Sequence, residues 1–172
     1  MKLLVISDTH RLTWLAADLI GAIKDVDHII HLGDLVQDAA WLAEHTGRPV
    51  ISVKGNCDMN RSGDDARVLE TECGSILLVH GHNEHVKTTL EILRHKAKEA
   101  GCVAAFYGHT HEAHLEESEG ITLMNPGSVA LPKDGGDPSY AIAHTGREGI
   151  TASIIYLTRE LRGALERASR QG

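Results

Sequence analysis

The residues best suited to metal chemistry stand where apolar runs of this chain end. In the stretch CVAAFYGHTHEA, residues 102–113, an apolar run stops at Gly108, and His109 and His111 follow it. Equivalent places after earlier apolar runs hold Asp8, His10, Asp34, Asn56, His80 and His82. Carboxylate, carboxamide and imidazole groups suit Mn, Fe, Zn, Ni or Co. The recurrence of these residue types therefore indicates a metal centre and leaves the metal open.

The number of these side chains indicates two ions rather than one. Without His82 the set holds seven ligands, whereas a tetrahedral ion takes about four. Two ions about 3.5–4 Å apart that share a carboxylate would use the whole set and could clamp a phosphoryl group. Taken singly, Asp34 and Asn56 belong to the residue types that most often cap helices or turns. Their recurrence at equivalent places favours the metal centre.

The apolar runs themselves predict the buried strands of an α/β fold. They are KLLVIS (Lys2–Ser7), HIIHLGD, PVISVKGN, SILLVHGH and CVAAFYGHTH, and the later four each contain a Gly among polar residues. Apolar residues at helical spacing, and the segments between the runs, predict helices at 12–24, 36–44 and 84–100. The carboxyl ends of strands in such a sheet meet at one edge, where ligands bind. Side chains far apart in the sequence would therefore converge there.

Spacing within each run predicts which neighbouring side chains act together. In extended backbone, residues i and i+2 point to the same side. Asp8 with His10, and His109 with His111, would then serve one centre or two adjacent centres. Glycines stand beside these residues at positions 33, 55, 81 and 108. A glycine permits backbone angles and close approaches that a Cβ would obstruct, so sharp exits from the strands are expected.

The pattern changes after His111. The segments 114–125 and 139–157 each hold two strand-like pieces around a Gly-containing turn, which predicts two antiparallel hairpins. We expect them to form a second sheet packed on the first. Residues 132–139 are expected to be a loop. Residues 158–172 are expected to be an exposed, partly helical tail of a single domain that spans 1–172.

Composition excludes several classes of function. The net charge of −7 works against electrostatic binding to nucleic acid or to an anionic membrane. The first apolar run, Leu3 to Ile6, is far shorter than a signal sequence or membrane span requires, so a cytoplasmic protein is expected. The three cysteines contain no C-x-x-C pair. A disulfide framework or a thiolate zinc site is therefore not expected.

Six short motifs together carry a resemblance to a known family. They are DTH at 8–10, GD at 33–34, GNCD at 55–58, HGH at 80–82, GHTH at 108–111 and NPGS at 125–128. In this order they resemble the calcineurin-like metallophosphoesterases, and most of all the small single-domain phosphodiesterase branch. The resemblance covers residues 1 to about 157. It implies an α/β fold of the two-sheet αββα sandwich type, with metals at the strand ends.

The resemblance also implies a distribution of ligands. Asp8, His10 and His111 would hold the first ion, and Asn56, His80 and His109 the second. Asp34 would bridge both. Two divalent ions are implied, with Mn²⁺ the first expectation and Ni²⁺, Zn²⁺, Co²⁺ or Fe as alternatives.

The activity implied is hydrolysis of a small phosphodiester by attack of a metal-bound hydroxide. Similar small proteins often form dimers or tetramers, so a homo-oligomer is a further expectation. The alternative function is a metal-binding scaffold or interaction protein of the same fold, as in the retromer scaffold subunit. That relative departs from the ligand set, whereas this chain has every ligand type in place, which favours the enzyme.

The chain departs from the wider family at Cys57, where many relatives have a histidine that is thought to protonate the leaving group. A thiol has an ordinary pKa of about 8.5 and is a weak hydrogen-bond donor, so Cys57 is a poor replacement. His82 is the alternative donor. We expect Cys57, Asn125 and Ser128 to contact substrate, although the last two would equally support the metal site from behind. Ordinary surface or hydrogen-bonded roles are expected for the other histidines, at positions 28, 31, 45, 85, 95, 114 and 144.

Overall fold

The computed structural model describes residues 1–59, 61–133 and 135–169, with side chains described as far as residue 164. The elements within these residues are β1 (Lys2–Ile6), α1 (Thr13–Ala22), β2 (His28–His31), α2 (Val36–Thr46), β3 (Val50–Ser52), β4 (Ala66–Thr71), β5 (Gly74–Val79), α3 (Glu91–Glu99), β6 (Cys102–Phe106), β7 (Ala113–Ser118), β8 (Ile121–Pro126), β9 (Ser139–Gly146), β10 (Gly149–Tyr156) and α4 (Arg159–Ser169). Strands and helices alternate from β1 to β3 and again from β5 to β6, as the apolar runs predict.

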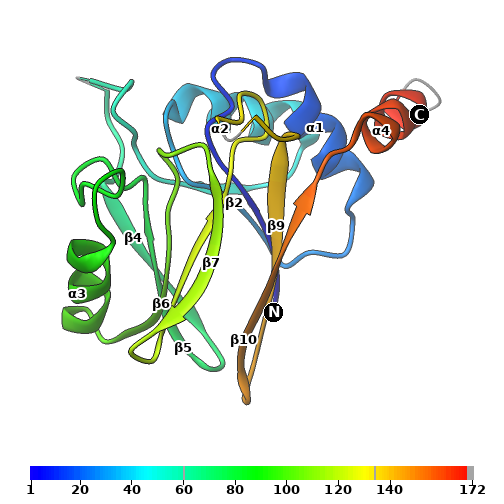
Figure 1. The fold of residues 1–172 in the computed structure, drawn as a ribbon. Helices are drawn as coiled ribbons and strands as arrows, with labels where there is room; N and C mark the ends of the chain where they lie inside the picture. Colours follow the sequence, from blue (N-terminus) through cyan, green and yellow to red (C-terminus); the bar gives the residue numbers. More distant parts are fainter. Residues whose placement is uncertain (60, 134, 170–172) are drawn as a thin grey trace.

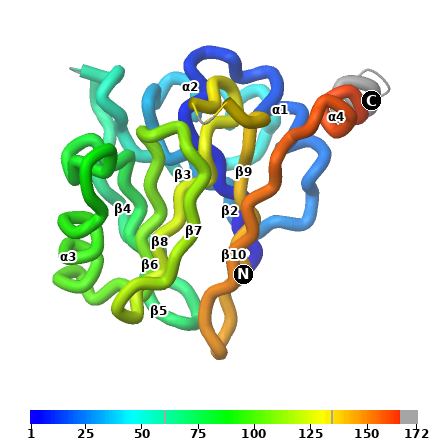
Figure 2. The backbone as a smooth tube through the Cα atoms, in the orientation of Figure 1, coloured from blue at the N-terminus to red at the C-terminus, as the bar shows by residue number. Residues whose placement is uncertain are grey.

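Two five-stranded sheets form the centre of the molecule, in the orders β10-β9-β1-β2-β3 and β4-β5-β6-β8-β7. Helices α1 and α2 cover the outer face of the first sheet, and α3 covers that of the second (Figures 1 and 2). The αββα sandwich is therefore confirmed. No helix within the described residues is long and apolar enough to cross a lipid bilayer.

Alternation along the strands explains why each sheet is buried on both faces. In β1, Leu3 and Val5 face the core between the sheets, whereas Leu4 and Ile6 pack with residues of α1. The second sheet repeats this pattern, because Ile76 of β5 faces the central core and Leu77 packs on the α3 side. Most buried side chains between the sheets and beneath the helices are aliphatic. Phe106 is the largest fully buried side chain.

The expected division of strands between the sheets was wrong. The two C-terminal hairpins do not form a sheet together: β7–β8 joins β6, and β9–β10 joins β1. The second sheet also contains β4, which the sequence analysis missed. The predicted helix 84–100 begins only at Glu91, because turns occupy residues 84–88. The tail forms α4, which contacts α1, while residues 170–172 lie outside the described residues.

The parallel strands set the position of the polar loops. Strands β1, β2 and β3 run parallel in one sheet, and β5, β6 and β8 run parallel in the other. Their carboxyl ends therefore lie at one edge of each sheet. The polar motifs at 8–10, 33–34, 55–58, 80–82 and 108–111 all follow these strands.

Candidate metal centre

Five loops bring the expected ligands together at the strand ends of the two sheets. Backbone hydrogen bonds join these loops directly, because Asp8 N–H donates to Gly33 O at 3.4 Å and Gly108 N–H donates to His80 O at 3.0 Å. A Cβ on Gly108 would lie 2.1 Å from Ser7 Oγ and 2.9 Å from Asp8 Oδ2. Only glycine allows this approach, as expected from its place beside the ligands.

The backbone at most of the expected ligands is not extended. The prediction that residues i and i+2 point to the same side because the strand continues was therefore wrong. Nine non-glycine residues within the described part of the chain have a positive φ. Five of the nine are expected ligands, namely Asp8, His10, Asp34, His109 and His111. Such conformations cost free energy and cluster at functional sites. The side chains converge because the loops curl, and not because a strand continues.

The first group of side chains is formed by Asp8, His10 and His111, whose ligand atoms all lie within 4.8 Å of one another. His111 Nε2 is 3.3 Å from Asp8 Oδ1. It also faces His10 Nε2 at 2.9 Å. His10 Nδ1 in turn lies 3.1 Å from Asp34 Oδ2. Asp34 is therefore next to the group that the resemblance assigns to the first ion.

The second group is formed by Asp8, Asp34 and His80, again within 4.8 Å of one another. Asn56 Oδ1 lies 3.0 Å from His80 Nε2. The ring centroid of His109 lies 5.0 Å from that of His80. The two groups share Asp8, so the structure brings all seven expected ligands into one continuous cluster.

Backbone carbonyls fix the orientation of two imidazoles. His80 Nδ1–H donates to Leu32 O at 2.7 Å, and His111 Nδ1–H donates to Leu131 O at 2.8 Å. In the neutral rings, Nε2 then carries the lone pair and points into the cluster. Histidines that bind metals typically have their other ring nitrogen anchored in this way.

Several electron pairs consequently face one another without a proton between them. The Nε2 lone pair of His80 faces Asn56 Oδ1, and that of His111 faces the Asp8 carboxylate. Asp8 Oδ1 and Asp34 Oδ2 are buried and have no hydrogen-bond partner among the described residues. Buried carboxylate oxygens are costly unless a donor or a cation satisfies them. These oxygen and nitrogen donors therefore fit divalent metal ions.

Ionisation in the cluster agrees with this fit. Burial alone would raise the pKa of Asp8, but His111 and His80 in their protonated forms, and the hydrogen bond from Ser7 O–H, would stabilise the carboxylate and outweigh it, and the pKa lies at about 2. Burial, followed by the neighbouring His80, lowers the pKa of His109 to about 4. At neutral pH the carboxylate is thus ionised and His109 is neutral, which are the forms that bind metals. A proton added to His111 Nε2 would be donated to Asp8, and this hydrogen bond raises the pKa of His111, so the position attracts positive charge.

Cys57 lies at the exposed margin of the cluster. Asn56 Nδ2–H donates to its sulfur at 3.4 Å. The hydrogen bond to Asp34, followed by burial, raises the pKa of the Cys57 thiol to about 11. The thiol therefore stays protonated at neutral pH, so it is neither an activated nucleophile nor an effective acid.

Asn125 and Ser128 are fully buried beneath the loops. Asn125 Nδ2–H donates to Gly108 O at 2.9 Å and to Thr110 Oγ1 at 3.0 Å. Ser128 O–H donates to Asp8 O at 2.8 Å, and its oxygen accepts Leu131 N–H at 2.7 Å. This geometry favours the supporting role over direct contact with substrate.

His82 lies beside the cluster but outside both groups. Its ring centroid is 5.5 Å from that of His80 and 6.1 Å from that of His109. Its Nδ1 is buried without a hydrogen-bond partner among the described residues. Burial, followed by the neighbouring His80, lowers the pKa of His82. Less imidazolium is then present at pH 7, which weakens the prediction that His82 protonates a leaving group.

The role of Asp58 was not predicted from the sequence. Its carboxylate accepts Val36 N–H at 2.9 and 3.1 Å and Gly55 N–H at 2.9 Å. One buried side chain thus joins the first turn of α2 to the loop that carries Asn56. Its place at the end of the GNCD motif, three residues after Gly55, was the available signal, since Asp often accepts backbone N–H groups in turns.

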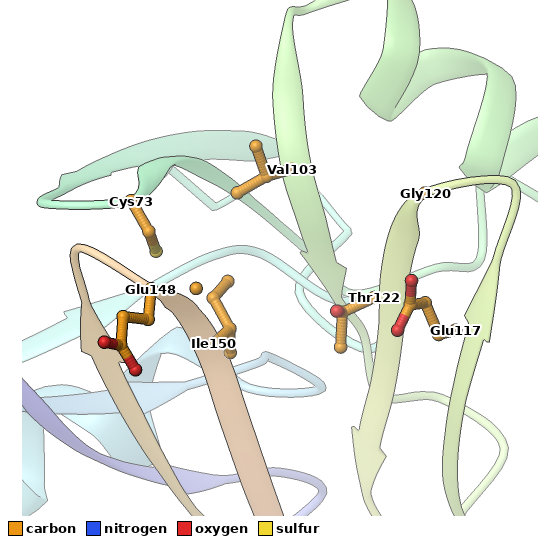
Figure 3. A pocket seen from close by; sticks show the side chains of 8 residues that line it. Cys73, Val103, Glu117, Gly120, Thr122, Glu148 and Ile150 are labelled. Carbon is orange, nitrogen blue, oxygen red and sulfur yellow. The ribbon is translucent and has the colours of Figure 1, made fainter.

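A separate cavity of about 290 Å³ lies at the opposite, turn end of the sandwich (Figure 3). It is lined by Cys73, Val103, Glu117, Thr122, Glu148 and Ile150, together with two glycines. None of the expected ligands is among these residues. The cavity is therefore distinct from the candidate metal centre.

Comparisons with known proteins find phosphoesterases among the relatives of this chain. A family model described as the calcineurin-like phosphoesterase superfamily domain matches residues 1–148. A probable metallophosphoesterase of Bacillus subtilis is 35% identical over 143 residues, which are 83% of either chain. A phosphodiesterase of Methanocaldococcus jannaschii is 28% identical over 144 residues, 74% of this chain and 83% of the relative.

Solved structures show the same fold. A conserved protein of Streptococcus pneumoniae, described as a predicted phosphoesterase, superposes with a TM-score of 0.78 at 24% identity, covering 90% of this chain and 88% of the other. Entamoeba histolytica Vps29 in complex with zinc superposes with a TM-score of 0.74 at 23% identity, covering 92% and 94%.

Proposed function

Because this chain belongs to the calcineurin-like phosphoesterase superfamily, we propose that it is a metal-dependent phosphodiesterase with two divalent ions at the strand ends. One observation carries the proposal. Lone pairs of His80 and His111 and the unpartnered oxygens of Asp8 and Asp34 converge in one buried cluster. Divalent cations would satisfy these nitrogen lone pairs and carboxylate oxygens.

The proposed ligands divide between the two ions as the resemblance implies. Asp8, His10 and His111 would hold one ion, and Asn56, His80 and His109 the other, with Asp34 shared. The contact of His10 Nδ1 with Asp34 Oδ2, and that of Asn56 with His80, support this division. Mn²⁺ is the first expectation, and the mixed oxygen and nitrogen donors also suit Ni²⁺, Co²⁺, Zn²⁺ and Fe.

Two bound ions would supply Lewis acidity, lower the pKa of a water towards about 7 and stabilise charge on a phosphoryl group. The protein contributes the arrangement of the donors. The carboxylate of Asp8 is ionised because its pKa is about 2. The anchored Nδ1 atoms of His80 and His111 prevent ring rotation. The cluster is thus organised before any substrate arrives.

The second candidate is a metal-binding scaffold of the same fold. It rests on the likeness to Vps29, whose Entamoeba protein was solved with zinc. At 23% identity this likeness concerns the fold alone. The complete set of seven expected ligands favours the enzyme, and turnover separates the two functions.

A chromogenic phosphodiester, bis(p-nitrophenyl) phosphate, tests the proposal. The metal-free protein should gain hydrolytic activity on addition of Mn²⁺, Ni²⁺, Co²⁺ or Zn²⁺, and p-nitrophenyl phosphate should be a poorer substrate. Metal binding without turnover of either compound would favour the scaffold. A protein that neither binds these ions nor turns over substrate would contradict both candidates.

A further inference from the structure

Thr9, His31 and Asp38 form a buried hydrogen-bonded chain behind the metal centre. Their side chains are at most 5% exposed, and none is among the seven proposed ligands. Asp38 is in the first turn of α2, where its carboxylate is also stabilised by the helix dipole. Three polar side chains from separate elements are thus withdrawn from solvent and paired with one another.

The donors and acceptors in this chain fit one arrangement. Gly33 N–H donates to His31 Nδ1 at 3.2 Å, which leaves the proton of the neutral ring on Nε2. His31 Nε2–H then donates to Thr9 Oγ1 at 3.0 Å. Thr9 O–H donates in turn to Asp38 Oδ2 at 2.5 Å. Each donor has one acceptor, so the order of the bonds is fixed.

Asp38 also accepts a second bond from the same loop. Arg11 N–H donates to Asp38 Oδ2 at 2.8 Å. One carboxylate oxygen therefore holds Thr9 and Arg11, the residues on either side of His10. His10 and Arg11 both have positive φ values, of 45° and 64°. A loop in this conformation needs such outside support, because it is locally unfavourable.

The other end of this hydrogen-bonded network reaches the loop that carries Asp34. The N–H of Gly33 belongs to the residue directly before Asp34, which itself has a φ of 83°. The single network thus joins the loop of His10 to the loop of Asp34. Within these loops, His10 Nδ1 lies 3.1 Å from Asp34 Oδ2.

We propose that the Thr9–His31–Asp38 network positions His10 relative to Asp34, and that it sets the affinity of the centre for its metal. This inference rests on the proposed function, because it assumes that His10 and Asp34 are ligands. The network acts through the loops and touches neither substrate nor metal. Supporting hydrogen bonds of this kind typically change metal affinity about 10–100-fold when removed.

Thr9→Val tests the inference because it removes the hydroxyl and keeps the shape of the side chain. The chelator-treated protein is titrated with Mn²⁺ by calorimetry, and its metal-free thermal unfolding is recorded. Thr9→Val should bind at least one ion about 10-fold or more weakly. Thr9→Ser, which restores the hydroxyl, should return the affinity to near the wild-type value.

Thr145→Val is the matched control. Thr145 is also buried, and its hydroxyl donates to Glu72 Oε2 at 2.8 Å. It pairs with Met1 at the opposite end of β1 from the centre. Thr145→Val should therefore lower the metal-free unfolding midpoint to a similar degree as Thr9→Val, with wild-type affinity for Mn²⁺.

A purely structural role would give a different result. Thr9→Val would then unfold at a lower temperature and still bind Mn²⁺ with wild-type affinity and stoichiometry, which would overturn the inference. A wild-type protein that binds no Mn²⁺, Ni²⁺, Co²⁺ or Zn²⁺ would instead overturn the proposed function. If Thr9→Val does not fold, Asp38→Ala should lose affinity and Asp38→Asn, which keeps an acceptor oxygen, should retain it. Equal affinity in these two variants contradicts the inference.

Discussion

Asp34 is the single residue whose loss should have the largest effect on the centre. Its Oδ2 is buried without a hydrogen-bond partner among the described residues and lies 3.1 Å from His10 Nδ1. Asp34→Ala removes the carboxylate proposed to serve both ions. Loss of a partner that only supports a ligand already costs about 10–100-fold. We therefore expect this variant to lose at least about 100-fold in activity, and to bind fewer than two Mn²⁺ ions by elemental analysis.

Cys57→Ala provides the contrast on the neighbouring loop. A residue that acts as general acid contributes roughly 10²–10⁴-fold to the rate. The raised pKa of the Cys57 thiol, about 11, makes it a poor acid. We therefore expect a much smaller loss of phosphodiester hydrolysis than in Asp34→Ala. Equal inactivity in a folded, metal-loaded Cys57→Ala protein would contradict this assignment.

At the residue scale, the side chains that converge in the cluster were predictable and their supports were not. Asp8, His10 and His109 could be assigned to the cluster from the sequence because the same residue types recur where successive apolar runs end. His31 and Asp38 could not, because one resembles an ordinary strand-end histidine and the other an acidic residue in a first helical turn. Their pairing through Thr9 depends on contacts 22 and 29 residues apart.

Loops between elements hold the ligands by close backbone contact, and Gly55 shows this most directly. A Cβ on Gly55 would lie 2.3 Å from both the Cα and the N of Asp34. Gly55→Ala must therefore displace one of the two loops. We expect lower thermal stability and Mn²⁺ affinity reduced about 10-fold or more, since ligand placement is disturbed.

Gly21→Ala is the control for this substitution. Nothing lies within 4 Å of a Cβ at Gly21, which is in α1. Alanine at an open helical position typically stabilises by about 0.5–1 kcal/mol. Gly21→Ala should therefore keep the wild-type affinity for Mn²⁺ and unfold at the same or a higher temperature. A Gly55→Ala protein with the same behaviour would show that the Gly55–Asp34 contact is unimportant.

At the element scale, local pattern predicted the strands better than their partners. Apolar runs and turn residues located β1, β2, β5 and β6, because these signals are local. The separation of the two hairpins into different sheets depends on long-range pairing of β9 with β1 and of β8 with β6. Strand β4 was missed because its residues are half-buried or exposed and include no long apolar run.

At the scale of the whole molecule, the centre joins the two sheets. Asp8, His10, Asp34 and Asn56 follow strands of the first sheet, whereas His80, His109 and His111 follow strands of the second. Bound ions would therefore link the two halves of the sandwich. At 100 times its dissociation constant, a ligand that binds only the folded state stabilises it by about 2.7 kcal/mol.

Metal removal should accordingly lower the unfolding temperature. For a chain of this length, about 2.7 kcal/mol corresponds to a shift of roughly 5–11 °C. We expect saturating Mn²⁺ to raise the midpoint of the chelator-treated protein by this order, measured by circular dichroism. Asp34→Ala should show a much smaller rise. An identical rise in both proteins would place the stabilising ion elsewhere.

Acid should destabilise the metal-free protein well above the range in which carboxylates titrate. Folding lowers the pKa values of His31, His82 and His109. Below an ordinary histidine pKa of about 6.5, the unfolded chain therefore binds protons that the folded chain does not. Stability then falls as the pH falls. For His109 this loss extends from pH 6.5 to about 4. His111 acts in the opposite direction, because its raised pKa favours the folded state in acid.

Folding lowers the pKa of three histidines and raises that of one. We therefore expect the unfolding midpoint to decline between pH 6.5 and 4. Asp8 adds to it only at lower pH, as the pH falls from its ordinary pKa of 3.8 towards 2. Thermal unfolding in chelator across pH 8 to 4 measures the decline. His109→Gln should make it shallower, because one group that takes up a proton on unfolding is removed. His144→Gln, at an exposed position of β9, is the control, and a flat wild-type profile would contradict the burial of neutral histidines in this centre.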